Sequence, residues 1–263
     1  MDLGLRDKTV LVTASSKGLG RACALALSQE GARVAICARE SQALECAATE
    51  IRQATGNEVL SMPADLSRDE DCRRVVEDTV AHFGALHVLV TNNGGPPPGD
   101  FLAFSDDDWY RAVDLTLMSA VRLVRAALPI MQQQQWGRIV NIVSITAREP
   151  LDNLVLSNAL RPGVIGMART LANQVAAVGI TVNNVLPGMM RTDRVEQLAE
   201  AQANKQGIAV EEVLRGYAAP VPVGRVGRPE ELAALVAFLA SEQAAYINGV
   251  SILVDGGRFR GLM

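Results

Sequence analysis

The sequence predicts an α/β fold in three layers, a doubly wound parallel sheet that is covered by helices on both faces. Short apolar runs alternate with segments of helical periodicity from one end of the chain to the other. The runs are almost continuously hydrophobic, as expected of parallel strands that are buried on both faces. Such alternation requires right-handed crossovers. The expected strands are Thr9–Val12, Val34–Cys37, Val59–Met62, Val88–Val90, Ile139–Val143, Val182–Leu186 and Ser251–Val254.

No repeat or linker divides the chain, so residues 1–263 are expected to form a single domain. Apolar residues make up 49% of the composition, which is enough for a sizeable core. The segment 190–220 has helical spacing but no apolar strand. We expect it to be a mobile cover over a binding site.

The composition also argues against several classes of protein. The formal net charge is -4 and no block of basic residues is present, so no nucleic-acid partner is expected. No apolar run approaches the roughly 20 residues of a membrane span. The 4 cysteines and 2 histidines lack the paired spacing of a metal site, so no metal is expected. Reduced cysteines and a first strand too early for a signal peptide favour a cytoplasmic protein.

Glycines and one serine mark the expected ends of helices. Gly31, Gly84 and Gly179 follow three helical segments, where a residue of left-handed conformation commonly ends a helix. Ser67 and Glu70 have the spacing of a capping box at the start of the third helix.

The candidate site is organised around the turn between the first strand and the first helix. Gly18 and Gly20 let the backbone approach a ligand and let the helix lie close to the strand. Free N–H groups and the dipole at the helix start attract a pyrophosphate. The glycine that usually opens such a loop is absent, because Ala14 stands there. The residues expected to bind a dinucleotide here are Thr13, Ser15, Ser16, Lys17, Gly18, Leu19 and Gly20.

The residues that follow the second strand bear on the choice of cofactor, because ligands bind at the carboxyl ends of strands in such sheets. Ala38 removes the acidic residue that would repel a 2′-phosphate, and Arg39 offers that phosphate a bidentate partner. Lys17 adds a second positive charge. These residues favour NADP(H) over NAD(H); the alternative is that Lys17 and Arg39 are solvated surface cations.

Further candidate residues follow the third and fourth strands. Asp65 and Leu66 are placed to touch an adenine ring. Asn92 is expected to tie neighbouring strands together through its amide, and Gly94 to admit the cofactor. The run Pro96–Pro98 stiffens this loop, either as a pocket wall or as a plain turn.

Together these segments resemble the short-chain dehydrogenase/reductase family over essentially the whole chain, which implies a Rossmann fold. Thr13–Gly20 is similar to the family's nucleotide loop, and Thr91–Gly94 to its Asn-Asn-Ala-Gly stretch. Pro187, Gly188 and Thr192 resemble its Pro-Gly-x-x-x-Thr segment, where the resemblance implies that the threonine meets the nicotinamide carboxamide. The bacterial 3-oxoacyl-[acyl-carrier-protein] reductases show the closest resemblance. Two C-terminal segments also match, Arg225–Glu231 and Asn248–Gly257.

The catalytic positions depart from the family pattern, which uses an Asn, a Ser, a Tyr and a Lys. Ser144 stands at the serine position, which the resemblance implies bonds the substrate carbonyl. Ser157 and Arg161 stand where the tyrosine and the lysine belong, and Thr116 stands at the asparagine position. A serine hydroxyl titrates far above a phenol and is shorter, so Ser157 is a poor general acid without a bridging water. Arg161 keeps a positive charge and can hold a cofactor ribose, but it cannot relay a proton.

Two consequences of these departures stay open at this point. Pro162 disfavours helical geometry at Arg161, so one interpretation starts this helix near Pro162 and re-aims Arg161. Another group would also have to supply the proton. Tyr217 in the cover segment is one candidate, and one of Glu149, Asp152 and Asn153 acting through water is another, although packing and solvation are the ordinary roles of such side chains.

Three functions are compatible with the sequence. The first is an NADP(H)-dependent oxidoreductase that reduces a 3-oxoacyl-like carbonyl or oxidises an alcohol by hydride transfer, with a non-standard proton path and a small-molecule substrate. The second is a catalytically impaired nucleotide-binding or regulatory protein. The third is an inactive partner subunit of an active relative. The resemblance implies a homodimer or homotetramer. Ala168, Ala172 and Ala176 either pack across a two-fold axis or within the chain's own core.

Overall fold

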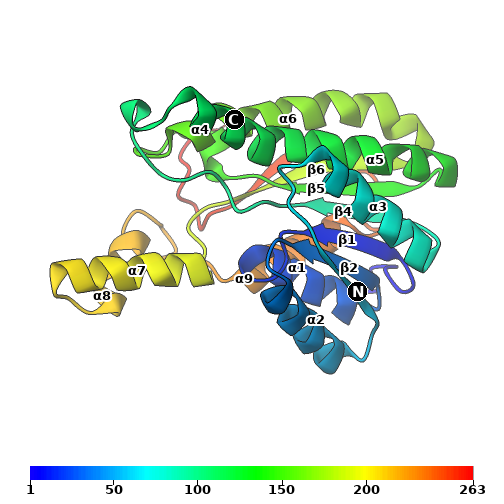
Figure 1. The fold of residues 1–263 in the computed structure, drawn as a ribbon, viewed down its shortest axis with the longest axis horizontal. Coiled ribbons are helices and arrows are strands. Elements are labelled where there is room, and N and C mark those ends of the chain that lie inside the picture. Colours follow the sequence, from blue (N-terminus) through cyan, green and yellow to red (C-terminus); the bar gives the residue numbers. More distant parts are fainter. Residues whose placement is uncertain (263) are drawn as a thin grey trace.

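The strands of the computed structural model, which describes residues 1–262, form one parallel sheet (Figure 1). The sheet has seven strands in the order β3-β2-β1-β4-β5-β6-β7. Each predicted apolar run coincides with one of them, apart from Val143, which lies just beyond β5, so the predicted α/β fold is confirmed. The strands are β1 (Thr9–Thr13), β2 (Arg33–Ala38), β3 (Val59–Pro63), β4 (Val88–Thr91), β5 (Gly137–Ile142), β6 (Ile180–Pro187) and β7 (Ser251–Val254).

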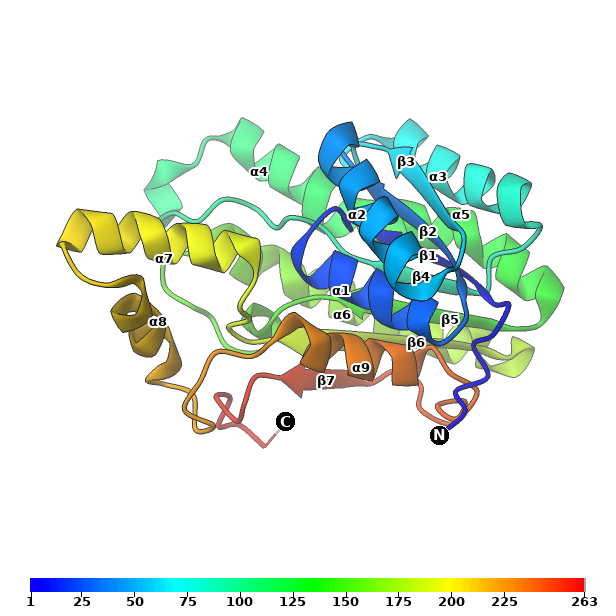
Figure 2. The same ribbon diagram turned by 90° about the horizontal axis from the view of Figure 1, so that it is seen from below.

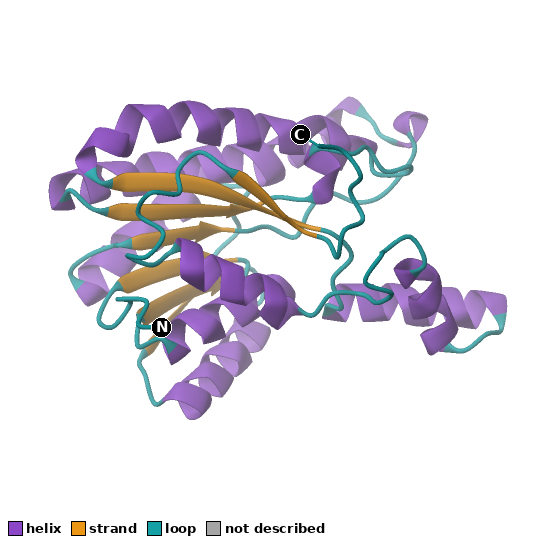
Figure 3. Ribbon diagram, turned by 180° about the vertical axis from the view of Figure 1, so that it is seen from behind, coloured by secondary structure: helices purple, strands orange, loops and turns teal. Residues whose placement is uncertain are grey.

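Helices cover both faces of this sheet (Figures 2 and 3). The α-helices are α1 (Gly18–Gln29), α2 (Ser41–Thr55), α3 (Asp69–Phe83), α4 (Asp106–Val113), α5 (Ser119–Gln134), α6 (Val155–Val175), α7 (Asp193–Gln206), α8 (Val210–Ala218) and α9 (Pro229–Leu239). Shorter helical turns are η1 (Phe101–Ala103), η2 (Asp114–Met118), η3 (Ile145–Ala147) and η4 (Ala176–Val178). Helices α1, α2 and α9 contribute to the core on one face, and α3, α5 and α6 on the other.

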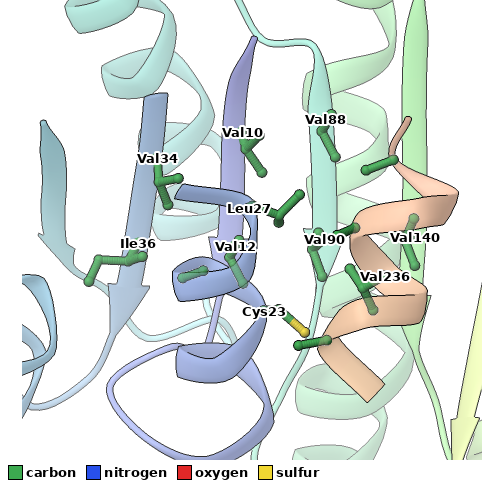
Figure 4. Packing of buried hydrophobic residues seen from close by; sticks show 14 of the residues in the cluster. Val10, Val12, Cys23, Leu27, Val34, Ile36, Val88, Val90, Val140 and Val236 are labelled. Carbon is green, nitrogen blue, oxygen red and sulfur yellow. The ribbon is translucent and has the colours of Figure 1, made fainter. Parts of the chain in front are cut away.

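Successive residues of each central strand alternate between these two cores, because side chains on a strand point to opposite faces in turn. Val10 and Val12 of β1 pack with Cys23 and Leu27 of α1 (Figure 4), whereas Leu11 belongs to the opposite core. All these side chains are fully buried. The central strands are therefore anchored on both faces, and their carboxyl ends form a fixed platform.

The helix ends predicted at Gly84 and Gly179 are confirmed, whereas the helix start predicted at Ser67 is wrong. Gly84 caps α3 at φ +80°, and Gly179 ends the helical turn η4 at φ +75°. The predicted capping box at Ser67 is wrong, because α3 begins at Asp69 and its N-cap residue, Arg68, makes no side-chain cap. The Ser67 hydroxyl donates instead to Asp65 Oδ1 at 2.8 Å. Local bonding among short polar side chains competes with capping in this way.

Helix α6 corrects two further interpretations. It begins at Val155 and runs through Pro162, so the helix does not start near the proline. Pro162 is exposed, while Leu160 and Val164 on either side of it are buried, and this packing outweighs the missing hydrogen bond. Ala168 and Ala172 are fully buried in the chain's own core, so they do not face a partner across a two-fold axis.

The segment predicted as a cover forms the helical pair α7 and α8, which stands away from the sheet and its flanking helices (Figure 1). The two helices pack on each other through Ala199, Ala203, Val213 and Leu214. Tyr217 joins this small core and donates its hydroxyl to Gln202 Oε1 at 2.9 Å. The structure therefore gives Tyr217 a packing role within the helical pair.

Residues 1–262 contain no helix that is both long enough and apolar enough to cross a membrane. The same residues contain no group of three His, Cys, Asp or Glu side chains arranged to hold a metal ion.

Strand order reverses between β1 and β4, since the chain moves outward from β1 to β3 on one side and from β4 to β7 on the other. In open parallel sheets, the carboxyl ends of the two strands at such a point flank a crevice that receives ligands. The loops that follow β1, β4 and β5 therefore define where a site should be sought.

Candidate active site

The loop between β1 and α1 has the geometry of a phosphate cradle. Lys17, the N-cap residue of α1, is extended, no side chain caps the helix, and its first turn contains no acidic residue. The first N–H groups of α1 are therefore free of side-chain partners. A Cβ at Gly20 would lie 2.9 Å from Ala14 C and 2.9 Å from Ser15 Cα. Only glycine permits this close approach of helix and loop.

Ala14 occupies the position where a glycine would be expected, and it adopts φ +48°. This left-handed conformation is unfavourable for a residue with a Cβ, by roughly 1–2 kcal/mol. Strain of this kind persists where the surrounding structure fixes the backbone, and it is concentrated at binding sites. The loop thus keeps the shape of a glycine turn despite the substitution.

Hydroxyl and amide groups join this loop to the ends of β2 and β4. Ser15 Oγ donates to Val12 O at 2.8 Å and accepts from Cys37 N at 3.2 Å. Thr13 Oγ1 donates to Asn92 O at 2.8 Å and accepts from Asn92 N at 2.7 Å. Asn92 Nδ2 donates to Ala14 O at 3.2 Å, so its amide ties neighbouring strand ends together as expected. Thr13 and Ser15 shape the loop, whereas Ser16 and Leu19 are half-buried beside it.

The end of β2 presents positive charge to solvent. Lys17 and Arg39 are both exposed, and neither forms an ion pair with a carboxylate of residues 1–262. Ala38, the last residue of β2, is buried and carries no charge. After β3, Asp65 Oδ1 accepts hydrogen bonds from the backbone N–H and the hydroxyl of Ser67. Leu66 is buried in a core cluster, so its side chain packs inward.

Ser144 follows β5 and caps the turn η3, where its Oγ accepts a hydrogen bond from Thr146 N at 3.1 Å. That contact uses an acceptor lone pair and leaves the hydroxyl hydrogen free to donate. Ser157 lies on α6 and is buried, and its Oγ lies 2.9 Å from Thr146 Oγ1. Thr146 therefore contacts both serines, and the Ser157 hydroxyl is already engaged within the protein.

Arg161 lies one turn after Ser157 on α6, and its side chain is 8% exposed. Its guanidinium donates from Nη1 to Ile142 O at 3.2 Å and from Nη2 to Asn93 Oδ1 at 3.3 Å, while Nε has no partner. Burial, and to a lesser extent the nearby Arg194, lowers the pKa of Arg161 to about 10. The group still carries its charge at neutral pH, beside the ends of β4 and β5.

Thr116 lies in the π-helical turn η2 between α4 and α5, and it is fully buried. Its Oγ1 has no hydrogen-bond partner among the described residues. Turns of this type are rare and frequently mark functional sites. The neighbouring Leu117 lies 3.4 Å from where a Cβ of Gly163 would stand, so η2 packs directly on α6.

The loop after β6 closes the opposite side of the crevice. Pro187 ends β6, and a Cβ at Gly188 would lie 2.8 Å from Asp255 Cβ, so this turn requires glycine. Thr192 caps α7 by accepting from Val195 N at 3.4 Å. Its Cγ2 lies 3.4 Å from where a Cβ of Gly18 would stand. The start of the cover segment therefore lies against the nucleotide loop.

Three residues at the site escaped the sequence analysis. Asn93 accepts from both Arg161 and Gly95 N, Thr146 joins the two serines, and Arg194 donates from Nη1 to the carbonyl of Gly94. Asn93 is next to Asn92, and Thr146 is two residues from Ser144; Asn92 and Ser144 were both candidates in the sequence analysis. Arg194 gave no signal, because its contact lies 100 positions away in the sequence.

A doubly wound sheet with a close-packed glycine loop at its switch point defines the dinucleotide-binding class of α/β protein. The family model described as enoyl-(acyl carrier protein) reductase matches residues 13–258. The 3-oxoacyl-[acyl-carrier-protein] reductase FabG of Pseudomonas aeruginosa is 36% identical over 259 residues, which cover 98% of this chain and 99% of that protein. The chain therefore belongs to the short-chain dehydrogenase/reductase family, as the sequence motifs suggested.

Solved structures agree with this assignment. The L-sorbose reductase of Gluconobacter frateurii, determined with NADPH and L-sorbose, is 32% identical, with a TM-score of 0.97 and complete coverage of both chains. A variant of actinorhodin polyketide ketoreductase, determined with NADPH, is 31% identical, with a TM-score of 0.91 over 97% of this chain and 98% of that one. The similarity thus extends over the whole fold and includes proteins that bind NADPH.

Proposed function

We propose that this protein is an NADP(H)-dependent oxidoreductase that reduces a carbonyl group, or oxidises the corresponding alcohol, with a proton path that bypasses Ser157. One observation carries the proposal. Hydrogen bonds link the nucleotide loop at Ala14 through Asn92 to the end of β4, and Arg161 then joins Asn93 to Ile142 at the end of β5. The phosphate cradle and Ser144 therefore belong to one rigid crevice.

The residues of this crevice fit a phosphorylated dinucleotide. The free N–H groups of α1 would hold the pyrophosphate, and the close contact at Gly20 keeps them at the crevice floor. Arg39 and Lys17 would hold the 2′-phosphate. Arg161 would hold a ribose hydroxyl, and Gly94, Pro187, Gly188 and Thr192 would line the nicotinamide end, with Asp65 and Leu66 at the adenine end. When bound, the cofactor supplies the hydride.

Ser144 is the residue that we propose for polarising the substrate. Because Thr146 N–H already donates to its Oγ, the Ser144 hydroxyl is oriented to donate to a substrate oxygen. The positive charge of Arg161 stabilises negative charge that develops on that oxygen. Ser157 is held by Thr146 and does not reach the substrate, so a water molecule delivers the proton. Thr116, which stands at the family's asparagine position, is the further residue that we assign to the site, because its buried hydroxyl has no partner among the described residues.

Replacing Ser144 with alanine tests this assignment. We expect the rate of carbonyl reduction to fall about 100-fold, because a single donor to a developing oxyanion is worth that much. The affinity for NADPH, measured by its fluorescence, should stay within about threefold, since Ser144 does not contribute to the phosphate cradle. Unchanged turnover would contradict the role of Ser144, and failure of NADPH to bind the unmodified protein would contradict the proposal as a whole.

Replacing Arg39 with alanine tests the choice of cofactor. We expect the Kd for NADPH to rise about 10- to 100-fold while the Kd for NADH changes little, because only the former carries the 2′-phosphate. Arg6→Ala is the matched control, since Arg6 is also exposed but precedes β1, at the opposite end of the strands. Equal losses for both cofactors would contradict the NADP(H) preference.

A second candidate function is a nucleotide-binding or regulatory protein without turnover, alone or as the inactive partner of an active relative. The replacement of the family's tyrosine by Ser157 favours it, because Ser157 is buried, its hydroxyl pairs with Thr146, and a serine is a poor general acid. The discriminating result is tight NADPH binding without oxidation of NADPH across 3-oxoacyl thioesters, quinones and aldehydes. We also propose a cytoplasmic location and a homodimer or homotetramer, in line with the family resemblance.

A further inference from the structure

Two guanidinium groups meet at Gly95, in the loop that follows β4. A Cβ at Gly95 would lie 3.4 Å from Nη2 of Arg161 and 3.9 Å from Nη1 of Arg194. The two arginines come from different elements, α6 and the first turn of α7. Arg161 is buried and Arg194 is exposed, and an anion between the two guanidinium groups would relieve the repulsion of their like charges.

The protein itself supplies no such anion. Neither arginine forms an ion pair with a carboxylate of residues 1–262. The acceptors for Arg161 are the Ile142 carbonyl and the Asn93 amide, both neutral, and its Nε has no partner although the side chain is more than nine-tenths buried. A buried charge without a counter-charge is strongly unfavourable for folding. The presence of a buried, unpaired arginine at this position therefore indicates a ligand that supplies the negative charge.

Arg194 holds a fixed position on the opposite side of the same loop. Its guanidinium donates to the carbonyl oxygen of Gly94, which anchors the start of the cover segment over the crevice. The neighbouring Arg191 differs, because it pairs with Glu196 at 2.8 Å. Arg194, in the first turn of α7, therefore has charge to offer a ligand, whereas Arg191, which precedes the helix, is already paired with a carboxylate.

We infer that the substrate carries a carboxylate, which binds between Arg161 and Arg194 while its carbonyl group lies at Ser144. The inference rests on the proposed function and narrows its substrate to small oxo acids. Arg161 Nη1 donates to Ile142 O at 3.2 Å, and Ser144 follows two residues later, so the guanidinium and the Ser144 hydroxyl lie at the same end of β5. A small oxo acid, with its carboxylate a few bonds from the carbonyl carbon, would reach both groups. The ribose hydroxyl that Arg161 would also hold is neutral, so by itself it would leave the charge of Arg161 uncompensated.

The test compares acids with their neutral esters. Pyruvate, acetoacetate and levulinate would each be titrated against their methyl esters, with the protein alone and with saturating NADP⁺, and binding followed by calorimetry. We expect at least one acid to bind about 10- to 100-fold more tightly than its ester, as charge-assisted hydrogen bonds imply. Arg161→Gln and Arg194→Gln should each remove most of this preference, Arg161→Lys should retain part of it, and Arg191→Gln should leave it unchanged.

The possible outcomes separate this inference from the proposed function. Equal binding of acids and esters across all three pairs would overturn the inference, even if NADPH reduces neutral ketones. If Arg194→Gln loses affinity for NADPH but keeps the preference for acids, Arg194 binds a cofactor phosphate and not a substrate carboxylate. That result would also overturn the inference. Acid binding without any oxidation of NADPH would contradict the oxidoreductase proposal while leaving the carboxylate site in place.

Discussion

Replacing Arg161 with methionine should stabilise the ligand-free protein while it removes function. The buried guanidinium has only neutral acceptors, so an apolar side chain of similar length avoids its desolvation penalty. We expect a gain of about 1–3 kcal/mol in the free energy of unfolding. In a chain of this size, that raises the melting temperature by about 2–4 °C for each kcal/mol. Carbonyl reduction should fall at least about 100-fold.

Arg138→Met is the matched control, because Arg138 is also buried but is fully paired. Its guanidinium donates to the carbonyls of Ser241, Gly137 and Gly179, and it lies 3.6 Å from Glu242. Its removal loses these hydrogen bonds and should cost about 1–3 kcal/mol. Thermal denaturation of both variants measures whether each substitution raises or lowers the stability. A destabilised Arg161→Met protein would show that the fold itself depends on that charge.

Replacing Gly20 with alanine should abolish dinucleotide binding. The new Cβ would lie 2.9 Å from backbone atoms of both Ala14 and Ser15, and backbone cannot move aside as a flexible side chain can. Helix α1 must shift away from the loop, which costs about 1–3 kcal/mol through overpacking. The same shift removes the N–H groups from the pyrophosphate position. We expect NADPH affinity, measured by fluorescence titration, to fall at least about 100-fold.

Gly166→Ala provides the comparison for this variant. Gly166 lies inside α6, where a Cβ would meet nothing within 4 Å. Alanine there should stabilise the protein by about 1 kcal/mol, because glycine is unfavourable in a helix interior, and NADPH affinity should not change. Normal NADPH binding by Gly20→Ala would refute the placement of the pyrophosphate at the start of α1.

Local signals in the sequence were sufficient where neighbouring residues alone decide the structure. The apolar runs identified every strand, because a strand buried on both faces must be hydrophobic at successive positions. The glycines at positions 84 and 179 marked helix ends, because left-handed backbone favours glycine. The prediction at Ser67 failed, because the Ser67 hydroxyl bonds locally to Asp65 and the helix begins two residues later, at Asp69. The interpretation that this helix starts near Pro162 was also wrong, because the packing of α6 outweighs the hydrogen bond that proline removes.

The sequence by itself determined the α/β fold, the glycine loop at the end of the first strand and the family to which the chain belongs, since these depend on periodicity and on short motifs. Only the tertiary structure decided what the departures at the catalytic positions mean. It paired Ser157 with Thr146, buried Arg161 without a counter-charge and brought Arg194 to Gly94 across 100 positions of sequence. Such contacts join distant segments, and the free energy of a buried charge depends on every group around it, which no local pattern records.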